Sequence, residues 1–172
     1  MLQTARLTIE PLTLDDAPFI QALLNDPDFI AQIADRGIRD EAAARRYLEE
    51  GPLASYREHG FGLWAVRPRG GGDAIGICGL LRRETLADVD IGYALLPQAR
   101  GKGFAREAAE AVLHYARETL GLTRLVAIVA PGNAPSRALL EALGFRHERL
   151  VQLTPEAENL CLYGWEASET VA

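Results

Sequence analysis

The chain has 172 residues, 48% of them hydrophobic and 24% charged, which is typical of a globular domain rather than a disordered segment. Its formal net charge of −6 argues against nucleic acid as the main partner, because neutralising phosphates requires a basic face. No apolar run approaches the ~20 residues of a membrane span, and residues 1–11 lack the apolar stretch of a signal peptide. We therefore expect one domain, residues 1–172, in the cytoplasm, with no nucleic-acid and no membrane partner.

The chain has two cysteines, and both lie within apolar runs. We interpret Cys78 and Cys161 as buried thiols in a reducing compartment, although a disulfide between them stays open. No spacing of cysteine and histidine suggests a zinc site, so we expect no metal.

The N-terminal third predicts one strand followed by helices. Residues 5–12 alternate apolar and polar side chains, as a half-buried strand does. Residues 13–26 have the pattern of a helix with acidic residues in its first turn. Residues 39–60 are rich in alanine and charge, and predict one or two helices broken at Gly51-Pro52.

The central part predicts three strands and a long helix. Residues 60–66, 74–82 and 88–96 show the period-two pattern of strands, and the glycine-rich residues 67–73 join the first two as a turn. A helix follows from about residue 103 to 120, with its apolar positions on one face.

The C-terminal part predicts three more strands and one helix. Residues 124–130 are continuously apolar, as in a strand buried on both faces. Residues 134–143 form a helix that Gly144 ends, and residues 145–153 and 160–167 complete the chain as strands. This order of elements predicts a mixed α/β domain with a central sheet covered by helices.

The stretch PQARGKGFAREAAEAV, residues 97–112, places glycines and basic residues at the start of the long helix. A helix N-terminus offers free N–H groups and a partial positive charge, and phosphates bind there. Gly101 and Gly103 would let the backbone approach a phosphate closely. The basic side chains beside them are Arg100, Lys102 and Arg106. The stretch favours a pyrophosphate site, and a plain strand-to-helix turn with solvated basic ends is the alternative.

Two well-known phosphate motifs do not fit this stretch. A P-loop requires Ser or Thr after its lysine and an earlier glycine, but Gly103 follows Lys102 and Leu96 occupies the glycine position. A dinucleotide fingerprint requires a third glycine or alanine where Arg106 stands. The acidic residue expected after the next strand is also missing, because that segment ends in Asn133.

Residues 100–105, RGKGFA, resemble the [RQ]-x-x-G-x-[GA] motif of the GNAT superfamily of acetyltransferases, which grips the pyrophosphate of coenzyme A (CoA). DIGYALLP, residues 90–97, resembles the family's fourth strand. GNAPSRALLEALGF, residues 132–145, resembles its N-x-x-S…L-G-F segment. Residues 4–20 are similar to the start of the branch that includes the ribosomal-protein N-terminal acetyltransferases.

The resemblance implies the GNAT fold, a mixed, mostly antiparallel sheet of about seven strands with helices on both faces. The fourth and fifth strands splay apart, and pantetheine lies between them like an added strand. The residues that this implies for the cofactor are the backbone of Tyr93, Ala94 and Leu95, the loop and helix start Arg100, Gly101, Lys102, Gly103, Phe104, Ala105 and Arg106, and the side chains of Asn133 and Ser136. For Asn133, a turn followed by a helix cap is the alternative, and with the resemblance we expect a dual role as cap and cofactor contact.

The resemblance also implies the chemistry. A backbone N–H near Tyr93 would stabilise the oxyanion of the tetrahedral intermediate. Many members place a glutamate where this chain has Asp90, which could take the proton of the amine through a water; Asp88 is a second candidate, and a polar strand end is the alternative for both. Many members use a tyrosine beside the leaving thiolate, but here that position is Leu140, and Ser136 is the candidate to hydrogen-bond the sulfur.

These features predict an N-acetyltransferase that moves acetyl from acetyl-CoA to a primary amine by direct attack, without a covalent enzyme intermediate or a metal. An α-amino group has a pKa near 8, against about 10.4 for lysine, so a weak base favours a protein or peptide N-terminus as acceptor. Small amines remain open as acceptors. Two further functions stay open, a non-catalytic CoA-binding module and a domain that prefers ATP or NAD, and the chain could be a monomer or a homodimer.

Overall fold

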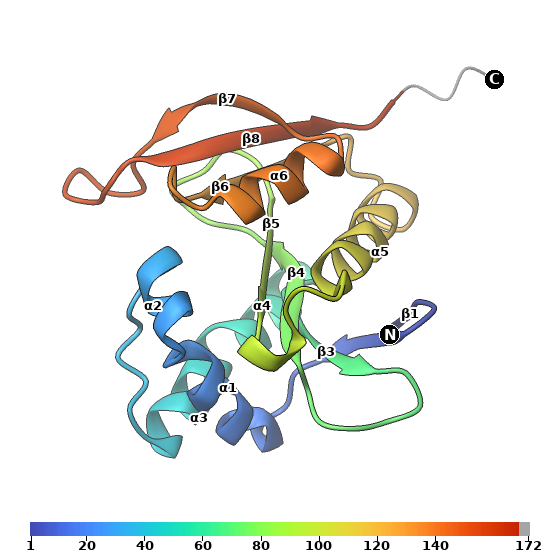
Figure 1. The fold of residues 1–172 in the computed structure, drawn as a ribbon, viewed down its shortest axis with the longest axis vertical. Coiled ribbons are helices and arrows are strands. Elements are labelled where there is room, and N and C mark those ends of the chain that lie inside the picture. Colours follow the sequence, from blue (N-terminus) through green and yellow to red (C-terminus); the bar gives the residue numbers. More distant parts are fainter. Residues whose placement is uncertain (169–172) are drawn as a thin grey trace.

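The computed structural model describes residues 1–168 as one open sheet with helices on both faces (Figure 1). The strands are β1 (Leu2–Gln3), β2 (Leu7–Pro11), β3 (Leu63–Pro68), β4 (Gly76–Leu81), β5 (Asp90–Leu95), β6 (Arg124–Val129), β7 (Arg146–Val151) and β8 (Leu160–Glu166). The α-helices are α1 (Ala17–Leu24), α2 (Pro27–Gln32), α3 (Glu41–Glu50), α4 (Pro52–His59), α5 (Phe104–Glu118) and α6 (Ala134–Ala142). Short 3-10 helices span Leu14–Asp16 and Pro97–Ala99.

The strands of the sheet follow the order β1-β2-β3-β4-β5-β6-β8-β7, and every neighbouring pair is antiparallel except β5 and β6. This confirms the predicted mixed, mostly antiparallel sheet, with the short β1 added to the strands expected from the sequence. Helix α2 was not predicted from the sequence. The sequence nevertheless contains the start signal of this helix, an aspartate followed by a proline. Asp26 caps the helix by accepting a hydrogen bond from the backbone N–H of Phe29, and Pro27 takes the first helical position.

Two apolar clusters lie on opposite faces of the sheet. On one face, α5 buries the stripe Ala108, Ala109, Val112, Leu113 and Ala116, as its sequence pattern predicted. Phe61 and Trp64 belong to the same cluster. On the other face, α1 and α3 cover the sheet through residues such as Ile20, Leu23 and Leu48. Helices therefore cover both faces of the sheet.

Both cysteines are buried free thiols, which confirms the interpretation of Cys78 and Cys161 as buried thiols. Burial raises the pKa of the Cys78 thiol to about 12, so this side chain is unreactive near neutral pH. None of the helices within residues 1–168 is long and apolar enough to cross a bilayer.

The sheet opens between β5 and β6. On one side, β5 pairs with β4 along its whole length, from Asp90 opposite Leu81 to Leu95 opposite Gly76. On the other side, the register between the described strands β5 and β6 has one residue pair, Asp90 with Val126. Beyond Asp90 the two strands diverge, and Figure 1 shows β6, β7 and β8 together at one end of the molecule, with β5 running away from them beside β4. This confirms the predicted splay.

The pairing of β3 with β4 depends on a close backbone approach at Gly79. A Cβ atom there would lie 2.0 Å from the Gly62 carbonyl oxygen and 2.8 Å from the Leu63 Cα atom. Gly92, the partner of Gly79 in β5, is less restricted, because a Cβ atom there would first meet the flexible Leu81 side chain at 3.2 Å.

We therefore expect Gly79→Ala to lower the free energy of unfolding by about 3 kcal/mol, because backbone atoms cannot yield to the added methyl group. This corresponds to a fall in melting temperature of about 6–12 °C for a chain of this size. Gly92→Ala is the matched control and should have a much smaller effect. Equal shifts of the two variants in thermal unfolding would contradict the close approach.

Candidate active site

The glycine loop at the end of β5 has the geometry of an anion site. Gly101 and Gly103 have φ angles of +75° and +80°, in the left-handed region that favours glycine. Gly103 is the N-terminal cap of α5, and in the described chain no side chain caps this helix start. The first N–H groups of α5 are therefore available to an anionic ligand, next to the exposed Lys102.

Arg6, which no sequence motif singled out, holds this loop in place. Its Nη1 donates to the Lys102 carbonyl oxygen at 2.9 Å, and its Nε donates to the Glu107 carboxylate at 2.8 Å. Its guanidinium also lies 4.4 Å from the centre of the Phe104 ring. The chain segment before β2 thus fixes both the loop and the first turn of α5.

The Arg100 side chain binds acidic residues at the start of α2. Its guanidinium donates to Asp26 at 2.5 Å, to Asp28 at 2.6 Å, and to the Leu95 carbonyl oxygen at 3.0 Å. The motif had suggested that all three basic side chains surround the phosphate. In the structure, Lys102 and Arg106 are the exposed ones, with Arg106 in a surface ion pair to Glu110.

Asn133, Ser136 and Tyr93 meet across the opening of the sheet. The Tyr93 hydroxyl lies 2.7 Å from Ser136 Oγ, so it joins β5 to α6, the helix that follows β6. Asn133 caps α6, because its Oδ1 accepts a hydrogen bond from the Ser136 backbone N–H at 3.3 Å. Burial raises the pKa of Tyr93 to about 12, which keeps the phenol protonated. Leu140, where many GNAT members have a tyrosine, is buried in the core.

Asp90 lies at the vertex of the opening and is only 1% exposed. Arg83 Nε donates to both of its carboxylate oxygens, at 3.1 and 3.4 Å. Burial raises the pKa of Asp90 to about 6, and the charge of Arg83 offsets only part of this effect. Asp88, the second candidate base, instead pairs with Arg124 at 3.1 Å, and Arg124 also binds Glu148.

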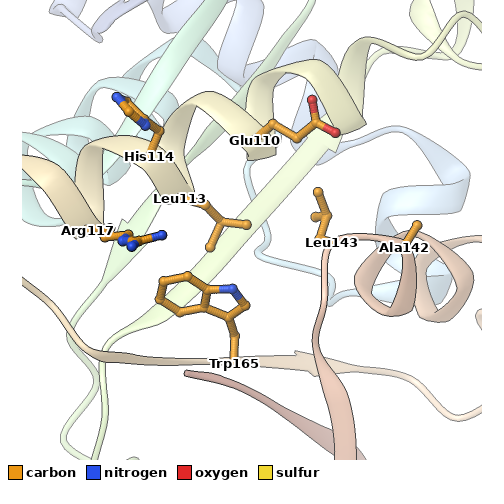
Figure 2. A pocket seen from close by; sticks show the side chains of 7 residues that line it. All are labelled: Glu110, Leu113, His114, Arg117, Ala142, Leu143 and Trp165. Atoms are coloured by element: carbon orange, nitrogen blue, oxygen red, sulfur yellow. The ribbon is translucent and has the colours of Figure 1, made fainter. Parts of the chain in front are cut away.

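A separate surface pocket of about 270 Å³ lies farther along α5, between this helix, the end of α6 and Trp165 of β8 (Figure 2). His114 and Arg117 are among the residues that line it. None of the site residues predicted from the sequence borders this pocket, so we do not assign the chemistry to it. Within residues 1–168, no group of three or more Asp, Glu, His or Cys residues is arranged to hold a metal ion.

The sequence profile of the acetyltransferase (GNAT) domain matches residues 6–146 of this chain. The chain belongs to the GNAT acetyltransferase family. Like its named relatives, it is an N-acetyltransferase: the uncharacterised N-acetyltransferase p20 of Bacillus licheniformis is 31% identical over 88% of this chain and 85% of its own length.

Solved structures agree with this assignment. An acetyltransferase from Agrobacterium tumefaciens has a TM-score of 0.79 and 28% identity, covering 96% of this chain and 94% of its own. A ribosomal L7/L12 alpha-N-protein acetyltransferase in complex with CoA has a TM-score of 0.77 and covers 95% of each chain. Its sequence identity of 17% limits that likeness to the fold.

Sequence patterns located the loop, β5 and the start of α6, and the structure brings these to one opening. They did not reveal the side chains that fix them, above all Arg6, Arg83 and Asp26. Arg6 and Glu107 are separated by 101 positions in the chain, and Arg100 and Asp26 by 74, so no local pattern links them. Arg83 was easier to link to Asp90 from the sequence, because only a short turn separates Arg83 from β5.

The contacts of Arg100 predict a role in stability. Arg100→Ala leaves the buried Asp26 carboxylate without its cation, so we expect a loss of about 2 kcal/mol in unfolding free energy, or about 4–8 °C in melting temperature. Arg106→Ala is the control and should change stability by less than about 0.5 kcal/mol, because its ion pair is exposed. Equal melting temperatures for the two variants would contradict the anchoring of α2 by Arg100.

The buried carboxyl of Asp90 predicts a pH dependence of stability. Between its ordinary pKa of 3.8 and the folded value of about 6, the folded state binds more protons than the unfolded state, so acidification stabilises the fold in this window. Relative to Asp90→Asn, the natural protein should gain about 2 kcal/mol between pH 7 and pH 4. Denaturant unfolding at several pH values measures this difference, with Asp88→Asn as control. A relative loss on acidification would show that Arg83 lowers the pKa instead.

Proposed function

We propose that the protein transfers the acetyl group of acetyl-CoA to a primary amine by direct attack. The opening between β5 and β6, with an uncapped helix N-terminus at its end, is the observation that carries this proposal. The free edge of β5 offers an amide-bearing ligand the hydrogen bonds of an added strand. The glycine loop offers its pyrophosphate backbone N–H groups and positive charge.

The donor would lie along both features. Pantetheine would follow the backbone of Tyr93, Ala94 and Leu95, and the pyrophosphate would bind the N–H groups from Gly101 to Ala105. Lys102 and Arg106 would supply charge at the surface. Asn133 and Ser136 would border the pantetheine from the side of α6. The CoA complex of the L7/L12 acetyltransferase, which shares the fold, supports CoA as the carrier.

The proposed chemistry needs a base, an oxyanion donor and a leaving group. The amine nitrogen attacks the acetyl carbonyl carbon, and its proton passes to Asp90 through a water, because only 1% of Asp90 is exposed. With a pKa of about 6, Asp90 is ionised at neutral pH and able to accept this proton. A β5 backbone N–H stabilises the oxyanion, and the C–S bond then breaks with its electron pair on sulfur.

As the acceptor we propose a protein or peptide N-terminus. An α-amino group with a pKa near 8 is partly neutral at physiological pH. A carboxylate base therefore removes its proton more easily than it removes the proton of a lysine side chain. The test is release of CoA thiol from acetyl-CoA in the presence of peptides, with polyamines and free amino acids in parallel. Turnover with a small amine and none with peptides would overturn this acceptor.

The glycine loop provides the sharpest mutational test of donor binding. Gly103→Val forces a branched side chain into a φ of +80° and toward Arg6, where a Cβ atom would lie 3.4 Å from Nη2. We expect at least about a 100-fold loss of acetyl-CoA affinity by calorimetric titration, equivalent to about 2.7 kcal/mol. The reason is that the side chain obstructs the anion site and the strain displaces the first N–H groups of α5.

The matched control is Gly121→Val. Gly121 has a φ of +68° and lies after α5, where a Cβ atom would meet nothing within 4 Å. It should carry a similar backbone penalty of about 1–3 kcal/mol and keep its affinity. Unchanged affinity in Gly103→Val, or equal losses in both variants, would refute the proposed donor site.

A further inference from the structure

A pair of hydroxyl groups bridges the two arms of the sheet opening. Tyr93 reaches from β5, and Ser136 lies in the first turn of α6, which follows β6 in the chain. The distance between Tyr93 Oη and Ser136 Oγ is 2.7 Å, and Tyr93 Oη also lies 3.4 Å from the Ser136 carbonyl oxygen. The contact therefore joins β5 to α6 across the opening, and a pantetheine that follows β5 would carry its sulfur past this pair.

The surroundings indicate which hydroxyl donates. Tyr93 has one hydroxyl proton, and Ser136 Oγ at 2.7 Å is the nearer of its two acceptors, because the Ser136 carbonyl oxygen lies at 3.4 Å. A phenol is also far more acidic than an alcohol, which makes it the better donor toward Ser136 Oγ. With the phenol as donor, the Ser136 hydroxyl accepts from Tyr93, and its own proton is free to point elsewhere.

We propose that Tyr93 is a positioning residue that orients the Ser136 hydroxyl so that its proton points at the sulfur of the departing CoA. This inference rests on the proposed function, and it assigns to a tyrosine of β5 a part in thiolate stabilisation. When the C–S bond breaks, its electron pair goes to sulfur, and Ser136 donates a hydrogen bond to the resulting thiolate. No proton is transferred in this step, so CoA leaves as the thiolate.

The acidities explain why this is a hydrogen bond and not acid catalysis. Burial raises the pKa of Tyr93 to about 12, whereas a thiol has a pKa of about 8.5. A proton transfer from the phenol to the thiolate would therefore be unfavourable by more than about a thousandfold. Position 140 of α6 offers no second hydroxyl, because Leu140 is apolar and buried in the core.

The test is a double-mutant cycle with Tyr93→Phe, Ser136→Ala and the double variant. Each single variant should lower kcat about 10-fold, with KM for acetyl-CoA within about twofold, because the lost hydrogen bond acts on a charge that forms only as the sulfur leaves. The double variant should be no slower than Ser136→Ala, because Tyr93 acts through the serine. Tyr115→Phe, whose ring packs edge-to-face on Trp64, is the control and should keep the natural rate.

A second measurement does not depend on which kinetic step is slow. The ultraviolet absorbance of the CoA thiolate in the binary complex reports the pKa of the bound thiol as pH is varied. We expect this pKa to lie below the value for free CoA in the natural protein, and to rise by about 0.5–1 unit in both Tyr93→Phe and Ser136→Ala. A structural role for the tyrosine would leave this value unchanged.

Additive losses in the cycle, or an unshifted thiol pKa in Tyr93→Phe, would overturn the inference. The proposed function would still stand if the natural protein binds CoA and turns over. Failure of the natural protein to bind CoA would overturn both.

Discussion

The site depends on the parting of two parallel strands after one residue pair. β5 and β6 meet at Asp90 and Val126 and then diverge, while β5 stays fully paired with β4 on its other side. An open strand edge is normally a liability at the rim of a sheet. Here it lies in the middle of the sheet, beside a helix N-terminus, so one ligand can complete both the strand and the helix start.

Three ion pairs, two of them long-range in the sequence, keep the opening in shape. Arg6 with Glu107 fixes the glycine loop to the start of β2, and Arg100 with Asp26 fixes the end of β5 to α2. Arg83 with Asp90 fixes the vertex. In each pair the charge of the arginine stabilises the fold, so a phosphate at the loop would meet mainly backbone N–H groups and the exposed Lys102 and Arg106. A chain with a net charge of −6 can bind an anionic cofactor in this way without a basic face.

The sequence predicted the fold well because the fold follows from local patterns. Strand alternation, the apolar stripe of α5 and the glycine loop each act over a few neighbouring residues, and their order identified the family. The sequence could not predict that the Arg100 guanidinium binds α2, or that Tyr93 reaches Ser136, because these contacts join residues 74 and 43 positions apart. The Asn133 cap, one half of the dual role expected from the sequence, forms in the structure, and the cofactor contact stays a proposal.

The most direct test of this mechanism is a crystal structure of the protein with CoA. We predict that pantetheine lies between β5 and β6, hydrogen-bonded to the backbone of Tyr93 to Leu95, with the pyrophosphate on the N–H groups of the glycine loop and the sulfur within hydrogen-bonding distance of Ser136 Oγ. CoA bound elsewhere, for example in the pocket beside Trp165, with the opening left empty, would contradict it.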